Sequence, residues 1–267
     1  MIAGSRGNSG SRMTWFEKLT GFPEKSPAFV RENLRIDGNR LLSEVNGRTM
    51  IWGRLETPSL TELREQVRSL GCRRSKTTVR EIVADVEELH KDRSNKNALF
   101  QVASQFNLLE MVSPHVTPEE GVGIYEHDRT QGPTCARAAG AGTIYRNYFV
   151  PVDGQIGQSA TNQIDCLSDM GAALGNGSGR LWEMRNGYAC ATGEGLAEIS
   201  HRLASFDESD IDDIRRRLRI GLQWETEVTA GDGGQTVSQT YCSALPVAYG
   251  CHPAGLWEPF ARIVLEA

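Results

Sequence analysis

Four acidic side chains lie close together in one glycine-containing stretch, PEEGVGIYEHDRTQGP, at residues 118–133. They are Glu119, Glu120, Glu126 and Asp128. A well-placed carboxylate can protonate a leaving group, activate a water molecule or stabilise a developing positive charge. The same stretch contains Gly121 and Gly123, whose missing side chains let an anion approach the backbone amides. These residue types fit hydrolysis of an anionic substrate, and a solvated acidic loop with turn glycines is the alternative.

Two polar residues follow runs of residues that favour β-strands. A β-branched run predicts a strand over residues 78–84 with Asp85 at its carboxyl end, and a second strand over residues 98–107 ends at Asn107. A third strand is predicted to lead into a small-residue loop within residues 236–250. Ligands bind at the carboxyl edge of open α/β sheets, so we expect these segments to meet the acidic stretch there. Each residue also has a simpler interpretation, Asp85 as a helix or turn cap and Asn107 as an ordinary asparagine at a strand end.

The rest of the pattern predicts the elements that position these segments. Asp-Gly and Asn-Gly steps between apolar runs predict a β-hairpin region over residues 34–56. Ser59 and Glu62 have the spacing of a capping box and predict the start of a helix. Further helices are expected within residues 134–148, 187–204, 206–225 and 257–267. Because strands and helices alternate, the chain is predicted to form a three-layer α/β domain.

The expected domain organisation is simple. Residues 1–24 are predicted to be a flexible leader, and residues 25–267 are predicted to form one domain. Within that domain, residues 153–185 are rich in Gly, Ser, Asn and Asp. Such a composition is typical of loops, so this segment is expected to be an insertion or a mobile loop.

The composition limits the classes of protein that fit. The 267 residues include 34 acidic and 29 basic side chains, and a net charge of −5 argues against general nucleic-acid binding. No apolar run approaches the roughly 20 residues that cross a bilayer. Six widely spaced cysteines without a CxxC pair argue against a disulfide scaffold and against a zinc site. We therefore expect a cytoplasmic monomer with reduced thiols, no metal ion and no membrane association.

Several of these segments together resemble the macrodomain superfamily, and within it the poly(ADP-ribose) glycohydrolase-like branch. The similar segments are IVADV with Asp85, VASQFN ending at Asn107, the stretch PEEGVGIYEHDRTQGP, and TYCSALPVAYGCHPAGLWEPFARIVLEA near the end. They cover about residues 77–150 and 236–267. The resemblance implies a three-layer α/β/α fold around a mixed sheet, and it implies binding of ADP-ribose.

The resemblance also implies roles for individual residues. Asp85 is expected to accept the adenine amino group, and Asn107 to hold the distal ribose. Gly121 to Ile124 are expected to form the first phosphate loop, and Ser243 to Ala248 the second. The full ligand-binding set that the resemblance implies is Asp85, Val86, Phe106, Asn107, Gly121, Val122, Gly123, Ile124, Tyr125, Gln131, Ser243, Ala244, Leu245, Pro246, Val247, Ala248 and Tyr249.

One departure from the family pattern concerns catalysis. The Gln-Glu-Glu step of glycohydrolase-like members is absent, since Gln131 is followed by Gly132 and Pro133. A catalytic carboxylate must then lie elsewhere in the acidic stretch. Asp128, flanked by a histidine and an arginine, is the preferred candidate, and Glu126 and Glu120 follow it.

The sequence leaves three functions to compare. The first is hydrolysis of the glycosidic bond between ADP-ribose and a modified protein side chain, with arginine as one candidate acceptor. ADP-ribosylated proteins are then the partners, ADP-ribose is the product, and no cofactor is needed. The second is a module that binds ADP-ribose without cleaving it, which the missing Gln-Glu-Glu step favours. The third uses Cys135 as a nucleophile, because a helix amino terminus can lower the pKa of a thiol.

Overall fold

The computed structural model describes residues 13–70, 80, 82–95, 100, 104–127, 134–224, 227–228, 235–236 and 241–242. Its α-helices are α1 (Trp15–Thr20), α2 (Pro27–Asn33), α3 (Leu60–Leu70), α4 (Val86–Lys91), α5 (Thr134–Ala138), α6 (Gly140–Tyr148), α7 (Ser168–Ala173), α8 (Gly193–Ser205) and α9 (Glu208–Arg216). Short 3-10 helices are η1 (Arg93–Asn95), η2 (Pro118–Glu120) and η3 (Gly123–His127).

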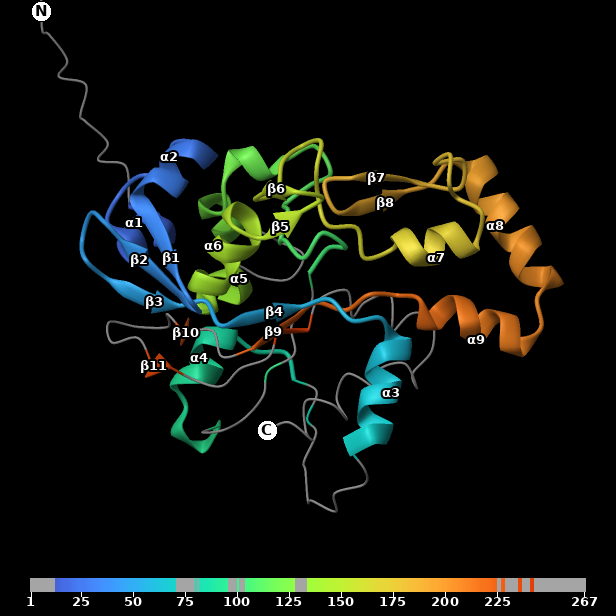
Figure 1. The fold of residues 1–267 in the computed structure, drawn as a ribbon, viewed down its shortest axis with the longest axis horizontal. Coiled ribbons are helices and arrows are strands. Elements are labelled where there is room, and N and C mark those ends of the chain that lie inside the picture. Colours follow the sequence, from blue (N-terminus) through green and yellow to red (C-terminus); the bar gives the residue numbers. More distant parts are fainter. Residues whose placement is uncertain are drawn as a thin grey trace, which may run out of the picture.

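The strands are short and lie in several small sheets. They are β1 (Leu34–Asp37), β2 (Arg40–Ser43), β3 (Thr49–Ile51), β4 (Arg54–Glu56), β5 (Pro151–Val152), β6 (Gln155–Ile156), β7 (Glu183–Arg185), β8 (Tyr188–Cys190), β9 (Leu222–Trp224), β10 (Glu227–Val228), β11 (Gln235–Thr236) and β12 (Tyr241–Cys242). Among the described residues every strand pairing is antiparallel, and the larger sheets, β1-β2-β3 and β12-β9-β4, have three strands each. The fold is thus mixed α/β, as expected (Figure 1).

Helix α1 belongs to the first hydrophobic core, so the flexible leader expected over residues 1–24 does not extend through it. Thr14 and Glu17 form a capping box at its start, and Gly21 ends it with a left-handed φ of 84°. The side chains of Trp15 and Phe16 are buried. This core also contains α2, the β1-β2-β3 sheet, the segment around Val122 and helix α6. These elements group together on one side of the molecule in Figure 1.

The hairpin region and the helix after it agree with the sequence. Strands β1 and β2 pair antiparallel with Asp37 opposite Arg40, and β3 continues the sheet. The Ser59 amide donates to Glu62 Oε2 at 2.6 Å, and the Glu62 amide donates to Ser59 Oγ at 3.2 Å. This is the predicted capping box, and it satisfies amides that would otherwise lack partners at the start of α3.

We predict that Ser59→Ala lowers the free energy of unfolding by about 1 kcal/mol, because the hydroxyl accepts a helix-terminal amide. Urea denaturation followed by circular dichroism measures this difference. Ser69→Ala is the control, since that hydroxyl is exposed and bonds only to a carbonyl in the same helix. Equal stability of the two variants would contradict the capping role.

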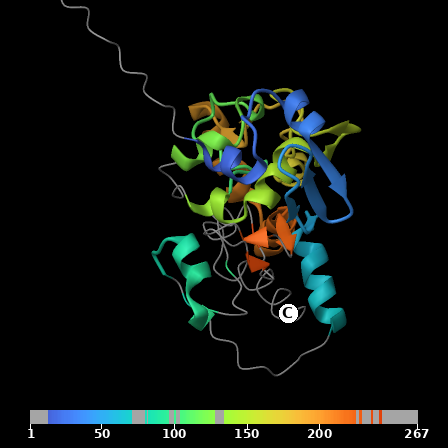
Figure 2. The ribbon, with the colours of Figure 1, turned by 90° about the vertical axis from the view of Figure 1, so that its left-hand side faces the viewer.

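A second hydrophobic core lies around β9 and includes part of the segment 153–185. It contains Leu60, Leu63, Leu167 and Leu222, from α3, the start of α7 and β9. Strand β9 pairs with β4, and the two strands lie near the middle of the view in Figure 1. Turning the molecule shows α3 and α4 extending from the same side of the main body (Figure 2). Within the described ranges, no helix combines the length and the apolar character that crossing a membrane requires.

Residues 153–185, expected as an insertion or a mobile loop, are joined to the rest of the domain by side-chain hydrogen bonds and contain β6, α7 and β7. Gln158 Nε2 donates to the carbonyls of Asn107 and Arg146, each at 2.9 Å. Asn176 Oδ1 accepts from the amide of Leu181 at 2.8 Å. In these places, backbone groups form hydrogen bonds with Asn and Gln side chains and not with other backbone groups. A loop-like composition therefore reflects irregular backbone that is fixed in place.

Two predicted strands are wrong for the residues that the structure describes. Residues 82–85 form neither a helix nor a strand, and the side chains of Ile82 and Val83 are exposed. Residues 105–108 form a turn, in which the Leu108 amide donates to the Gln105 carbonyl at 3.0 Å. β-branched composition favours a strand only where a neighbouring strand and a buried face are available. The sequence pattern carried no information about either.

Candidate functional site

The acidic stretch forms two short 3-10 helices, and two of its carboxylates bind the backbone. Glu120 Oε1 accepts from the Thr117 amide at 3.0 Å, as in a capping box. Glu119 accepts from the Ala160 amide with both oxygens, at 2.8 and 3.1 Å. The Glu120 carboxylate thus caps the start of η2, and the Glu119 carboxylate connects η2 to the segment that contains Ala160. Glu126, in η3, has a side chain that is 29% exposed and lies 3.9 Å from His127 Nε2.

The predicted first phosphate loop already holds an anionic group from the same chain. The Val122 amide donates to Glu24 Oε1 at 2.8 Å, and the Gly123 amide donates to Glu24 Oε2 at 2.7 Å. The Tyr148 hydroxyl donates to Glu24 Oε1 at 2.7 Å. Burial raises the pKa of Glu24, although all three hydrogen bonds oppose that shift. The Val122 and Gly123 amides thus bind the Glu24 carboxylate in this structure, and binding of a phosphate group by this loop stays a prediction.

The close approach of Glu24 accounts for the glycines of this loop. A Cβ atom at Gly121 would lie 2.5 Å from Glu24 Oε2, and one at Gly123 would lie 2.9 Å from the same atom. Gly121 also has a φ of 92°, which side chains disfavour. Both glycines are therefore required by the packing of this loop on Glu24.

Gly121→Ala is expected to lower the free energy of unfolding by about 2 kcal/mol, because it adds both a contact with Glu24 and backbone strain. Gly38→Ala is the matched control, since Gly38 has a φ of 58° and nothing within 4 Å of the added atom. It should cost about 1 kcal/mol or less. Thermal or urea denaturation of both variants measures the difference, and equal losses would remove Glu24 as the cause.

Two of the predicted site residues lie around one arginine. Arg137 on α5 forms a two-bond ion pair with Glu87 on α4, with Nη2 to Oε2 at 2.8 Å. The hydrogen bond with Glu87 raises the pKa of Arg137 further, and the charges of Asp85 and Glu126 add to this effect. Neither Arg137 nor Glu87 was predicted as a site residue. Arg137 is distinguished in the sequence by being the charged residue of TCARA, whose other residues are small.

Asp85 itself acts as a helix cap in this structure. Its Oδ1 atom accepts from the amides of Glu87 at 2.8 Å and Glu88 at 3.4 Å. This is the simpler of the two interpretations that the sequence allowed. Val86 is buried beside Cys135 and Ala138, so α4 and α5 pack through these side chains. Cys135 is thus enclosed rather than presented to solvent.

Asn107 is completely buried within a chain of amide side chains. Its Nδ2 donates to Gln163 Oε1 at 2.9 Å, and Gln163 Nε2 donates to Asn186 Oδ1 at 2.9 Å. Its Oδ1 accepts from the Leu109 amide at 3.0 Å. The polar atoms of Asn107 are therefore used inside the protein, and the residue lies in a turn and not at the end of the predicted strand. Phe106 is partly buried against a cluster that contains Leu108.

The other predicted residues divide into two groups. Ile124 packs against the first core, and Tyr125 is fully buried with its hydroxyl 3.2 Å from Met111 Sδ. Asp128, Gln131 and the second phosphate loop lie outside the described residues. That loop comprises Ser243, Ala244, Leu245, Pro246, Val247 and Ala248, and Tyr249, which follows it, also lies outside them. In the part of the chain that the structure describes, no three His, Cys, Asp or Glu side chains are grouped for a metal ion.

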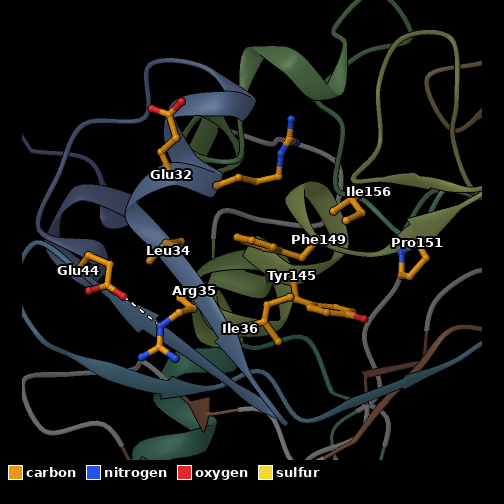
Figure 3. A pocket seen from close by; sticks show the side chains of 10 residues that line it. Glu32, Leu34, Arg35, Ile36, Glu44, Tyr145, Phe149, Pro151 and Ile156 are labelled. Carbon is orange, nitrogen blue, oxygen red and sulfur yellow. Dashed lines mark hydrogen bonds and ion pairs between the residues drawn. The ribbon is translucent and has the colours of Figure 1, made fainter.

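A cavity among the described residues is lined by none of these residues. It is a groove of about 550 Å³ between α2, β1 and the end of α6 (Figure 3). Its lining residues are Arg31, Glu32, Leu34, Arg35, Ile36, Glu44, Tyr145, Phe149, Pro151 and Ile156. Tyr145 stacks on Trp52 with ring centroids 3.5 Å apart. The groove has an aromatic wall and a rim on which Arg35 is paired with Glu44 at 3.1 Å.

No protein-family model matches the chain, and no curated protein or solved structure is significantly similar to it. The anion-binding loop and the charges around Arg137 are therefore the features on which a function can be based.

Proposed function

We propose that this protein is an ADP-ribosyl hydrolase. It would bind ADP-ribose attached to a protein side chain, cleave the glycosidic bond at the ribose and release free ADP-ribose. The observation that carries the proposal is the pair of amides at Val122 and Gly123, which binds a carboxylate in the manner that a phosphate group requires. The partners would be ADP-ribosylated proteins, and the proposal requires neither a cofactor nor a second protein subunit.

The proposal includes a specific fold within the mixed α/β class. A three-layer α/β/α arrangement of the macrodomain type would place the two phosphate loops at one edge of a mixed sheet. The mixed α/β class supports it, whereas the antiparallel pairings of the described strands do not by themselves build such a sheet.

The proposed chemistry uses carboxylates near Arg137. Cleavage passes through a transition state with positive charge on the ribose. An ionised carboxylate can stabilise this charge, or it can act as a general base that activates the attacking water molecule. Glu119 and Glu120 are engaged by backbone amides. The geometry thus favours Glu126 among the described acids, and Asp128 follows it in the chain by two residues.

The proposal is tested with a mono-ADP-ribosylated protein and the variants Glu126→Gln and Asp128→Asn. We expect the wild type to release ADP-ribose, and we expect at least one variant to lose about 100-fold in turnover while still binding ADP-ribose. Glu65→Gln, an exposed change on α3, is the control. A thermal shift with ADP-ribose and none with ATP, NAD or AMP is also expected. Absence of both binding and release would reject the proposal.

A module that binds ADP-ribose without cleaving it is the second candidate. The specific observation in its favour is that the carboxylates of Glu119 and Glu120 already serve the loop structure. Tight binding of ADP-ribose, together with no release from arginine-linked, serine-linked or acid-linked substrates, would select this function over the hydrolase.

A further inference from the structure

Strand β1 is an open edge of its sheet. Among the described residues it pairs with β2, and no strand lies on its other side. The Glu44 amide at the end of β2 donates to the Asn33 carbonyl at 3.0 Å, so the odd-numbered residues of β1 turn their backbone groups toward β2. Since the backbone groups of successive residues point to opposite sides, the amide and carbonyl of Ile36 face the open edge. A further strand can therefore pair with β1 at Ile36.

The open edge borders the groove of Figure 3. Leu34, Arg35 and Ile36 all line this groove. Because successive side chains of a strand point to opposite faces, a groove that contacts all three residues runs along the edge of the strand. Ile36 is 39% exposed, and Ile156 on β6, which lines the same groove, is 64% exposed. Exposed apolar side chains beside an open edge are typical of an interaction surface.

The charges on either side of Ile36 match those of a second copy of the same strand. Arg35 and Asp37 share one face of the sheet, and both are exposed. If two copies of β1 pair antiparallel with Ile36 opposite Ile36, Arg35 of each copy lies opposite Asp37 of the other. An axis at Arg35 or at Asp37 would instead place like charges opposite each other, which is destabilising. Charges on an edge strand usually prevent pairing, but this pattern permits one register.

We propose that two copies of this protein associate through β1, antiparallel about a two-fold axis at Ile36, so that their sheets become continuous. The pairing satisfies the edge groups of Ile36 and removes its exposed side chain from water. Arg35 now pairs with Glu44 at 3.1 Å, and the side chains are 59% and 52% exposed, so the guanidinium is open to a second acidic partner. The inference replaces the monomer expected from the sequence. It does not depend on the proposed function, because none of the proposed site residues lines the groove.

Sedimentation velocity of the full chain over a series of concentrations tests this interface, after circular dichroism has shown that each variant is folded. We expect a dimer for the wild type. Arg35→Asp and Asp37→Arg each place like charges opposite one another and should weaken the dimer at least about tenfold. The double variant, Arg35→Asp with Asp37→Arg, reverses the pattern and stays complementary to itself, so it should regain the dimer. Arg68→Asp, an exposed change on α3, is the matched control.

Mixing the two single variants tests the register directly. An equal mixture of Arg35→Asp and Asp37→Arg chains should form a heterodimer, because every charge then lies opposite an unlike charge. A wild type that is monomeric at about 100 μM, where weak specific interfaces still assemble, overturns the proposal. A dimer that both single variants leave unchanged, or that the double variant fails to restore, overturns it too. If Arg35→Asp does not fold, Asp37→Arg decides, since Asp37 is exposed at the end of β1.

Discussion

Phe16→Ala is expected to lower the free energy of unfolding by about 4 kcal/mol, because the ring is completely buried. It makes edge contacts with Phe22 and Tyr148, at centroid distances of 5.5 and 6.4 Å. Alanine would leave a cavity in the core that connects α1 to α6. Urea denaturation monitored by tryptophan fluorescence measures the change.

The control for this prediction is Met13→Ala, since Met13 is 59% exposed and precedes α1. It should change stability by less than about 0.5 kcal/mol. A similarly small effect of Phe16→Ala would mean that the amino-terminal segment is a leader after all and that α1 does not contribute to the core.

Arg146→Ala is expected to cost about 4 kcal/mol of stability as well, for a different reason. Arg146 is 3% exposed, and its guanidinium donates to the Leu108 carbonyl at 2.9 Å and to Thr143 Oγ1 at 3.1 Å. A further bond reaches Gln223 Oε1 at 3.4 Å. Truncation leaves these buried acceptors without their charged donor.

Two variants separate this network from a simple loss of charge. Arg185→Ala removes an exposed ion pair with Glu183 and should cost less than about 0.5 kcal/mol. Arg146→Lys keeps the charge but lacks the planar fork, so it should recover only part of the stability. Denaturation midpoints measured under the same conditions rank the variants. A loss below about 1 kcal/mol in Arg146→Ala would contradict the role of this network.

Turn residues, capping residues and the placement of charges predicted correctly those elements whose structure is decided by residues close by in the sequence. The hairpin region of β1 and β2 follows from its turn residues, and the capping box at Ser59 follows from a spacing of three residues. The acidic start and basic end of α9 also agree with its helical structure. In each case the deciding contacts lie within a few residues, so composition and spacing contain the information.

The errors arose where distant residues decide the structure. Helix α1 is ordered because Trp15 Nε1 donates to the Val122 carbonyl at 3.2 Å, across 107 residues of sequence. Among the described residues, no strand pairs with residues 82–85, although their β-branched side chains suggested one. Turn glycines and loop acids have the same sequence signature whether their anion comes from solvent or from the protein. Glu24 is 98 residues before Val122, and spacing cannot reveal that pairing.

The pairing of β4 with β9 has a consequence for how the protein is made. Arg54 in β4 and Gln223 in β9 are 169 residues apart, yet their atoms are joined by a hydrogen bond. A ribosome that adds about 5 to 20 residues per second needs about 10 to 30 seconds to synthesise that interval. During this time β4 has emerged without β9, its partner in the described sheet, and the edge of β4 is unpaired. The β4–β9 pair is therefore completed late in synthesis, only after Gln223 has left the ribosome.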